Sequence, residues 1–349
     1  MAKKSILAVF LILFLGISLI VGIPIFTLSI QLSTYDVIDV SDDSYMYTTS
    51  NSSEIQELNI NSDVGDIRLH YVDARVKHAV VIEVNFMMVG SNLAGKTPSE
   101  YFSIDWQNSS SPLNFTLELK SESLLDYSSL LVKDFSIIVS IREDLIFDMN
   151  IKVKEGDVEI VIPWGVSIND LLVNVTKGDI FYDFEFCTIQ GNIIGFVDEG
   201  NIDFRTYDAK YTQNSNWNFT LDTGDLTINI SQNRDLGVNL TGTAKINKGN
   251  VLFLYEDNSP NIGMRFEIPF GSDTDYHPNF PQCLHEYIFW GMCSNVVGFH
   301  YNDPDLSSNL SSVKLTSLDF LENRVKYYYD LRFEIFQGSF NMGALTSIN

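Results

Sequence analysis

The chain is organised around a tripeptide of Gly, then Asp or Asn, then an aliphatic residue, which recurs at nearly even spacing from residue 156 onward. After each glycine, apolar and polar positions alternate, as in Val158, Ile160 and Ile162. A period of two is typical of a strand with one buried face, and its repetition indicates stacked coils that bury these faces together. The corners at which a positive φ is expected are Gly65, Gly156, Gly178, Gly200, Gly224 and Gly249.

This pattern predicts an all-β fold, a single-stack β-solenoid or β-helix-like ectodomain. The regularity stops after Ile268, where prolines, cysteines and histidines gather, and a closing coil is expected at Gly338. The predicted organisation is a β-rich N-terminal part of the solenoid over 57–152, regular coils over 153–268, an insertion or cap over 269–312, and closing strands over 313–349.

The N-terminus predicts a membrane anchor. Lys3 and Lys4 precede an uncharged apolar segment, residues 6–30, whose helix would be roughly 37 Å long and would cross a hydrocarbon core of about 30 Å. The lysines favour a cytoplasmic tip at 1–5, a transmembrane signal-anchor helix at 6–30 and a flexible stalk at 31–56. The alternatives are a cleaved signal, which would make the protein secreted, and an edge strand within the stalk.

The net negative charge of the chain limits the kinds of partner that it can bind. Acidic residues outnumber basic ones by 45 to 22, and the formal net charge is −23 at pH 7. Such a surface repels phosphate backbones, so no nucleic-acid partner is expected. The partners that remain are the membrane itself, a surface protein or glycan ligand, and a second copy of the chain. No phosphate loop, dinucleotide fingerprint or hydrolase elbow occurs, and no cofactor is expected.

Several Asn-x-Ser/Thr sequons agree with an extracytoplasmic location. If the source organism glycosylates them, they mark surface positions. The candidate residues are Asn51, Asn108, Asn114, Asn174, Asn218, Asn229, Asn239 and Asn309.

Two of the three cysteines lie close together in the insertion. Cys283 and Cys293 are predicted to form a disulfide, because an extracytoplasmic setting favours oxidation. The alternatives are free thiols, or a metal site completed by His285 and His300, although the spacing matches no standard zinc pattern. Cys187 falls in a predicted strand, where a cysteine behaves as a small buried hydrophobe.

Two sets of acidic residues invite chemical interpretations. The repeated Asp or Asn after each corner glycine could stack into a cation site, or each side chain could hydrogen-bond its own turn; the second is expected. Asp198 and Glu199 could act as acid and base on a sugar, but beside a glycine corner they are expected to be solvated turn residues.

Aromatic residues in the insertion are a candidate binding surface. They could equally form the insertion's own small core. The residues are Tyr276, Phe280, Tyr287, Phe289 and Trp290.

The glycine corners, Gly65 and then Gly156 to Gly249, resemble those of the putative adhesin family of short β-solenoid domains of unknown function. The resemblance covers about residues 57–268 and implies a cell-surface or envelope role, with no catalytic residues to carry over. Together these features predict a membrane-anchored, extracytoplasmic, adhesin-like protein without catalytic activity, for surface binding or envelope assembly. The alternatives are an envelope carbohydrate-active enzyme on a solenoid scaffold and a purely structural surface protein.

Overall fold

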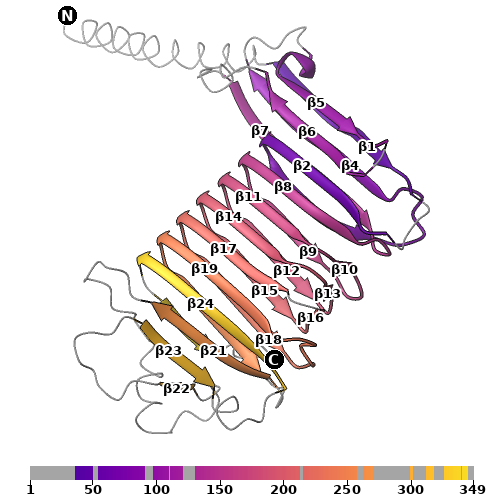
Figure 1. The fold of residues 1–349 in the computed structure, drawn as a ribbon. Coiled ribbons are helices and arrows are strands. Elements are labelled where there is room, and N and C mark those ends of the chain that lie inside the picture. Colours follow the sequence, from indigo (N-terminus) through magenta and orange to yellow (C-terminus); the bar gives the residue numbers. More distant parts are fainter. Residues whose placement is uncertain are drawn as a thin grey trace, which may run out of the picture.

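The fold is all-β, with parallel strands stacked into coils through the centre of the molecule (Figure 1). The structure is a computed structural model. It describes residues 36–49, 54–90, 97–109, 111–120, 130–212, 215–257, 262–269, 299–301, 312–317, 326–338 and 340–344.

One central coil illustrates the repeating unit. It begins with β11 (Leu171–Lys177), turns at Gly178, continues as β12 (Ile180–Glu185) and adds the short strand β13 (Thr188–Ile189). The next coil then begins with β14 (Ile193–Glu199), which pairs with β11 in parallel. Because the pairing is parallel and in register, equivalent residues of successive coils lie side by side on each of three sheets.

Sheet A carries the strand that follows each glycine corner. Its central strands are parallel, whereas β1, β4 and β7 pair antiparallel at the N-terminal end. In spatial order its ten strands are β1 (Asp36–Tyr47), β4 (Val80–Gly90), β7 (Leu130–Arg142), β3 (Asp66–Val72), β9 (Val158–Ile162), β12, β15 (Ile202–Tyr207), β18 (Leu226–Gln232), β20 (Val251–Asp257) and β25 (Phe340–Ala344).

Sheet B carries the strand that precedes each glycine corner, and it is antiparallel at both ends. Its twelve strands in spatial order are β22 (Phe299–Tyr301), β23 (Ser312–Ser317), β21 (Ile262–Pro269), β24 (Tyr327–Gln337), β19 (Leu240–Lys248), β17 (Asn216–Thr223), β14, β11, β8 (Phe147–Glu155), β2 (Gln56–Val64), β6 (Leu113–Leu119) and β5 (Phe102–Gln107). Sheet C contains β10 (Ser167–Ile168), β13 and β16 (Lys210–Tyr211).

The prediction of a single stack was wrong. Sheets A and B contain both parallel and antiparallel pairs, and at the ends of the stack the spatial order of the strands differs from their order in the chain. β24 lies between β19 and β21, and β3 lies between β7 and β9. A coil that simply ended would leave a row of unpaired backbone groups. Here strands distant in sequence complete each end, and some of them pair antiparallel, as β4 does with β1 and β7.

The predicted membrane-spanning location also needs correction. In the stretches that the structure describes, no helix is long and apolar enough to cross a membrane, and the one helical element is the 3₁₀ turn η1 (Pro98–Glu100). The predicted anchor, residues 6–30, lies outside those stretches. The predicted stalk is corrected too, because β1 pairs with β4 along the edge of sheet A, as in the alternative of an edge strand. The polar Asp and Ser positions of β1 hid its strand character in the sequence.

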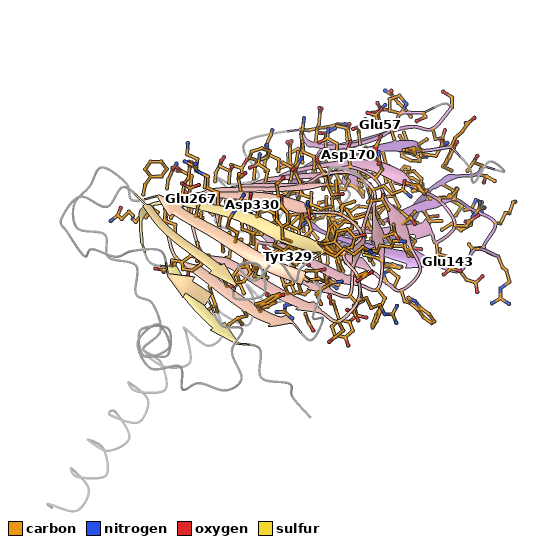
Figure 2. All side chains as sticks on the ribbon, turned by 60° about the horizontal axis from the view of Figure 1, so that its bottom comes forward. Glu57, Glu143, Asp170, Glu267, Tyr329 and Asp330 are labelled. Carbon is orange, nitrogen blue, oxygen red and sulfur yellow. The ribbon has the colours of Figure 1, made fainter. Side chains whose placement is uncertain are left out.

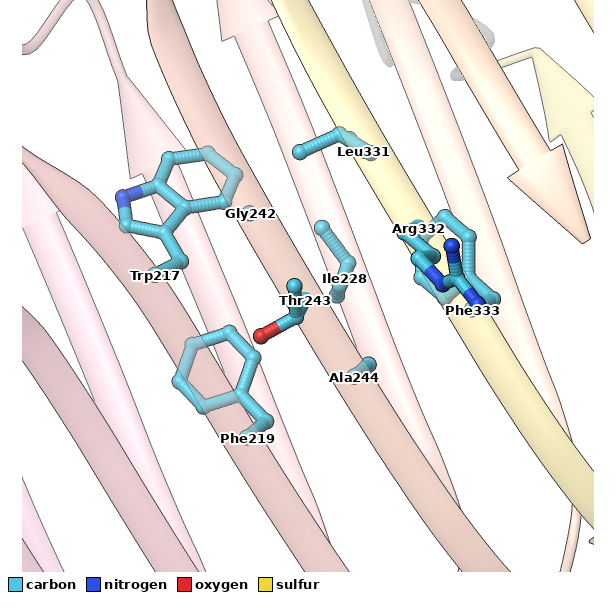
Figure 3. A pocket seen from close by; sticks show the side chains of 9 residues that line it. All are labelled: Trp217, Phe219, Ile228, Gly242, Thr243, Ala244, Leu331, Arg332 and Phe333. Atoms are coloured by element: carbon cyan, nitrogen blue, oxygen red, sulfur yellow. The ribbon is translucent and has the colours of Figure 1, made fainter.

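The core runs along the stack, between sheets A and B. Phe204 is fully buried, with its ring centroid 4.6 Å from that of Trp217 and 5.2 Å from that of Phe219. A gap of about 10 Å³ lies beside Gly242 and Ala244, where β19 contributes small residues to the core. Figure 3 shows the residues that line it. A gap of this size holds at most about one water molecule, so the interior offers no ligand cavity there.

Candidate functional site on the outer face of sheet A

The corner between sheets B and A is set by stacked glycines. A Cβ added to Gly200 would lie 2.0 Å from the carbonyl oxygen of Gly178, one coil away, and Gly200 has a φ of +142°. No L-residue with a side chain fits such an approach. Every predicted corner glycine has a positive φ: Gly65 (+104°), Gly156 (+144°), Gly178 (+140°), Gly200, Gly224 (+146°) and Gly249 (+153°), and Gly338 (+151°) extends the column.

The Asp or Asn after each glycine forms a ladder between coils. Asp157 Oδ1 accepts a hydrogen bond from the backbone N–H of Asp179 at 2.8 Å, and Asp179 Oδ1 accepts one from the N–H of Asn201 at 2.7 Å. The expectation that each side chain bonds its own turn is therefore corrected, because the bond goes to the next coil. In-register stacking brings that N–H within reach, since neighbouring strands lie about 4.8 Å apart.

A second ladder follows the corner at which sheet B begins. Asp170 Oδ1 accepts hydrogen bonds from the backbone N–H of Asn192 at 2.7 Å and from its side-chain amide at 3.1 Å. Figure 2 shows Glu57, Asp170 and Asp330 along this edge of the molecule. Among the described residues, no group of three or more His, Cys, Asp or Glu is placed to hold a metal ion. Both ladders consist of hydrogen bonds that join coil to coil.

The outer face of sheet A is crowded with carboxylates. Glu159 lies 3.7 Å from the guanidinium of Arg68, and Asp203 lies 2.6 Å from that of Arg205. Partial burial raises the pKa of Asp183, and the neighbouring Glu185 raises it further while Arg205 acts in the opposite direction. The face therefore carries more negative charge than its own cations neutralise.

A recess of about 380 Å³ lies on this face beside the glycine corner. Asp157 and Asp179 line it, but their Oδ1 atoms accept the backbone bonds of the ladder. Glu159 lines it as the partner of Arg68. Asp198 and Glu199, the pair considered for sugar hydrolysis, are exposed at the end of β14 in sheet B and do not line the recess. The carboxylates of the recess are thus already engaged by donors of the chain.

The opposite edge of sheet A carries an aromatic corner, defined here as Trp164, Phe186 and Tyr207. Trp164 is 78% exposed and Tyr207 is 40% exposed. This set was not predicted from the sequence, although a signal is present there: an aromatic residue follows Gly156 and Gly178 by eight positions and Gly200 by seven. The spacing was hidden because Trp164 and Phe186 lie beyond the last alternating positions of their strands, β9 and β12.

Most predicted binding residues cannot be placed. Cys283, Cys293 and the insertion aromatics Tyr276, Phe280, Tyr287, Phe289 and Trp290 lie outside the described residues, as do Asn51 and Asn309. The disulfide stays a prediction. Cys187 is a buried free thiol, and burial raises its pKa to about 12.

The remaining sequons divide by exposure. Half-buried asparagines within strands offer a poor approach to an oligosaccharide, whereas exposed ones leave room for it. Asn114, Asn174 and Asn229 are half-buried, and Asn108, Asn218 and Asn239 are exposed.

Comparison with known proteins gives a limited likeness. No family model and no curated protein matches the chain. Among solved structures, it aligns with a putative cell adhesion protein from Clostridium sporogenes ATCC 15579 at 12% identity, covering 88% of this chain and 100% of that one, with a TM-score of 0.31. A putative adhesin from Bacteroides fragilis NCTC 9343 aligns at 9% identity over 89% and 97%, with a TM-score of 0.32. At these values the likeness carries no argument about function, which has to rest on the chain's own surfaces.

Proposed function

We propose that this chain is a non-catalytic, adhesin-like surface protein that binds its partner through the outer face of sheet A. The observation that carries the proposal is the combination, on one sheet face, of crowded carboxylates with exposed aromatic rings along the neighbouring corner. Exposed aromatic residues are enriched where proteins bind partners, and uncompensated charge steers a partner of opposite sign. A face that extends over several coils suits a macromolecule better than a small substrate.

The arrangement of the acids favours binding over hydrolysis. A glycoside hydrolase needs two carboxyl groups that face each other across a substrate and remain available to it. On this face Asp157 and Asp179 hold backbone N–H groups of the next coil, and Asp203 is bonded to Arg205. These bonds stabilise the scaffold and occupy the oxygens that such chemistry would need.

The test is an array of purified surface proteins and glycans probed with the full-length chain. We expect saturable binding that is lost when Glu159 and Asp203 are replaced together by Gln and Asn. Glu118→Gln is the matched control, because Glu118 is an exposed acid on the outer face of sheet B. Binding that survives the double replacement, or release of sugar products from an arrayed glycan, would contradict the proposal.

A further inference from the structure

The aromatic corner is built so that its first ring stays outside the fold. The N–H of Val166 donates to the carbonyl of Pro163 at 3.3 Å, which closes a turn with Trp164 and Gly165 at its tip. Gly165 has a φ of +85°, the value that a type II turn requires at its third position. The turn directs Trp164 away from the coil, so its large apolar ring contributes little to the core.

The other two rings continue the same edge in the next coils. The N–H of Gly165 donates to the carbonyl of Phe186 at 3.3 Å, and the N–H of Phe186 donates to that of Tyr207 at 2.8 Å. The rings of Phe186 and Tyr207 lie 4.7 Å apart, edge to face, with an interplanar angle of 71°. Three adjacent coils thus present aromatic side chains in a column, but the last two rings are not coplanar.

Cations of the chain already lie over rings on this side of the molecule. The guanidinium carbon of Arg205 is 4.7 Å from the centroid of Phe181, and that of Arg234 is 4.6 Å from the centroid of Phe186. In the described part of the chain, no Lys or Arg lies over Trp164 or Tyr207. The local geometry therefore suits cation–π contacts, and two exposed rings remain available for them.

Charge at the corner favours the same ligand. Glu185 is exposed and lies directly opposite Tyr207 in the register of β12 and β15. Asp183 and Asp203 follow on the same face of sheet A. A cation over the ring of Tyr207 would thus meet a carboxylate beside it, whereas an anionic polymer would be repelled. The rings of Phe186 and Tyr207, at an interplanar angle of 71°, form no continuous flat platform on which a neutral glycan could stack.

We propose that the aromatic corner, with Glu185, binds a lysine- or arginine-bearing segment of a partner protein. The inference rests on the proposed function and names the chemistry of its partner. The cationic group lies against Trp164 or Tyr207, and the carboxylate of Glu185 neutralises it. Contacts of this kind suit an extended basic segment that runs along the stack from Trp164 to Tyr207 and passes Phe186, which Arg234 already covers.

The test measures the affinity of the full-length chain for fluorescent oligolysine and oligoarginine peptides, with a soluble neutral β-glucan as the second probe. Trp164→Ala and Tyr207→Ala should each weaken peptide binding about two- to fivefold, the range of exposed cation–π contacts, and Tyr207→Phe should retain it. Glu185→Gln should weaken binding and reduce its dependence on salt. Phe336→Ala, an exposed aromatic on sheet B, and Glu118→Gln are matched controls that should leave binding unchanged.

The replaced residues are exposed, so unchanged thermal unfolding midpoints serve as the folding check. Equal peptide affinity of the wild type and the Trp164→Ala/Tyr207→Ala variant would overturn the inference. So would salt-independent binding of the β-glucan that the double variant loses, because the corner would then be a glycan site. If the array detects a partner whose binding ignores these variants, the inference fails and the proposed function stands. If the peptides behave as expected and the array detects no partner, the proposed function fails and the corner remains a cation site.

Discussion

The two edges of sheet A are built in opposite ways. At the glycine corner, backbone atoms of successive coils approach so closely that a Cβ on Gly200 would lie 2.0 Å from a carbonyl oxygen. At the aromatic corner, a Cβ on Gly165 would meet nothing within 4 Å, although its φ is also positive. The first edge therefore tolerates little variation, and the second has space to carry different side chains in each coil. The contrast indicates that one edge holds the coils together while the other is free to serve binding.

The same small substitution at the two edges gives the largest contrast. Gly200→Ala combines an unfavourable φ with a collision against backbone, and it should cost about 4 kcal/mol or more in the free energy of unfolding. Gly165→Ala has only the unfavourable φ, so it should cost about 1 to 2 kcal/mol. Urea unfolding of the two variants measures both values. Equal costs would show that the coils do not stack on the glycine column.

The buried and exposed sides of one strand should differ almost as much. Phe204→Ala removes a fully buried ring and should cost about 3 to 5 kcal/mol. Asp203→Ala removes only a surface pair with Arg205 and should stay within about 0.5 kcal/mol. Chemical denaturation of the two variants tests the register of β15, which would be wrong if both changes were equally mild.

The ladder of Asp and Asn side chains should contribute less than the core. Asp179→Ala leaves the N–H of Asn201 without its 2.7 Å partner and should cost about 1 to 2 kcal/mol. Asp179→Asn keeps an acceptor oxygen at the same place, as Asn201 itself does for Asp225, and should be nearly neutral. Thermal unfolding of the Asp179→Ala and Asp179→Asn variants measures the two costs. A similar loss for both would indicate that charge, and not the hydrogen bond, matters.

The smallest effect concerns Asp183 and pH. Its pKa is raised in the folded protein by burial and then by nearby acids, so its ionisation disfavours the fold. Below the ordinary pKa of an aspartate, Asp183 is protonated in both the folded and the unfolded chain, and the fold has its full stability. This contribution to the free energy of unfolding is lost as pH rises through the raised pKa of the folded protein. Asp183→Asn should therefore unfold at a higher temperature than the wild type at neutral pH, and the two should converge near pH 3. A lower midpoint for the variant at neutral pH would mean that Arg205 outweighs the acids.

The central coils could be predicted from the sequence because each depends on residues close together in the chain. The spacing of Gly178 and Gly200 and the alternation around Phe204 already define the coil length and the buried face. The ends could not be predicted, because β24 and β7 are inserted beside strands far from them in sequence. The pattern of apolar and polar residues within a strand does not indicate which distant strand it pairs with.

The candidate site was less predictable than the coils. The carboxylates of sheet A are spread over several coils, and only their register brings Asp183 close to Asp203 and Glu159. Trp164, Phe186 and Tyr207 share a spacing that could have been detected, but exposure is not visible in the sequence. A tryptophan in an alternating chain is expected in the core, and the turn at Gly165 is what places it outside.

The central claim is that the glycine corner stabilises the stack while the aromatic corner serves binding. It is tested most directly by measuring the peptide affinity and the thermal unfolding midpoint on one sample of the Trp164→Ala/Tyr207→Ala variant. If the aromatic corner serves binding alone, oligolysine affinity falls about tenfold, as two exposed cation–π contacts imply, and the midpoint matches that of the wild type. Undiminished affinity, or a midpoint lowered as far as that of Gly200→Ala, would contradict the account.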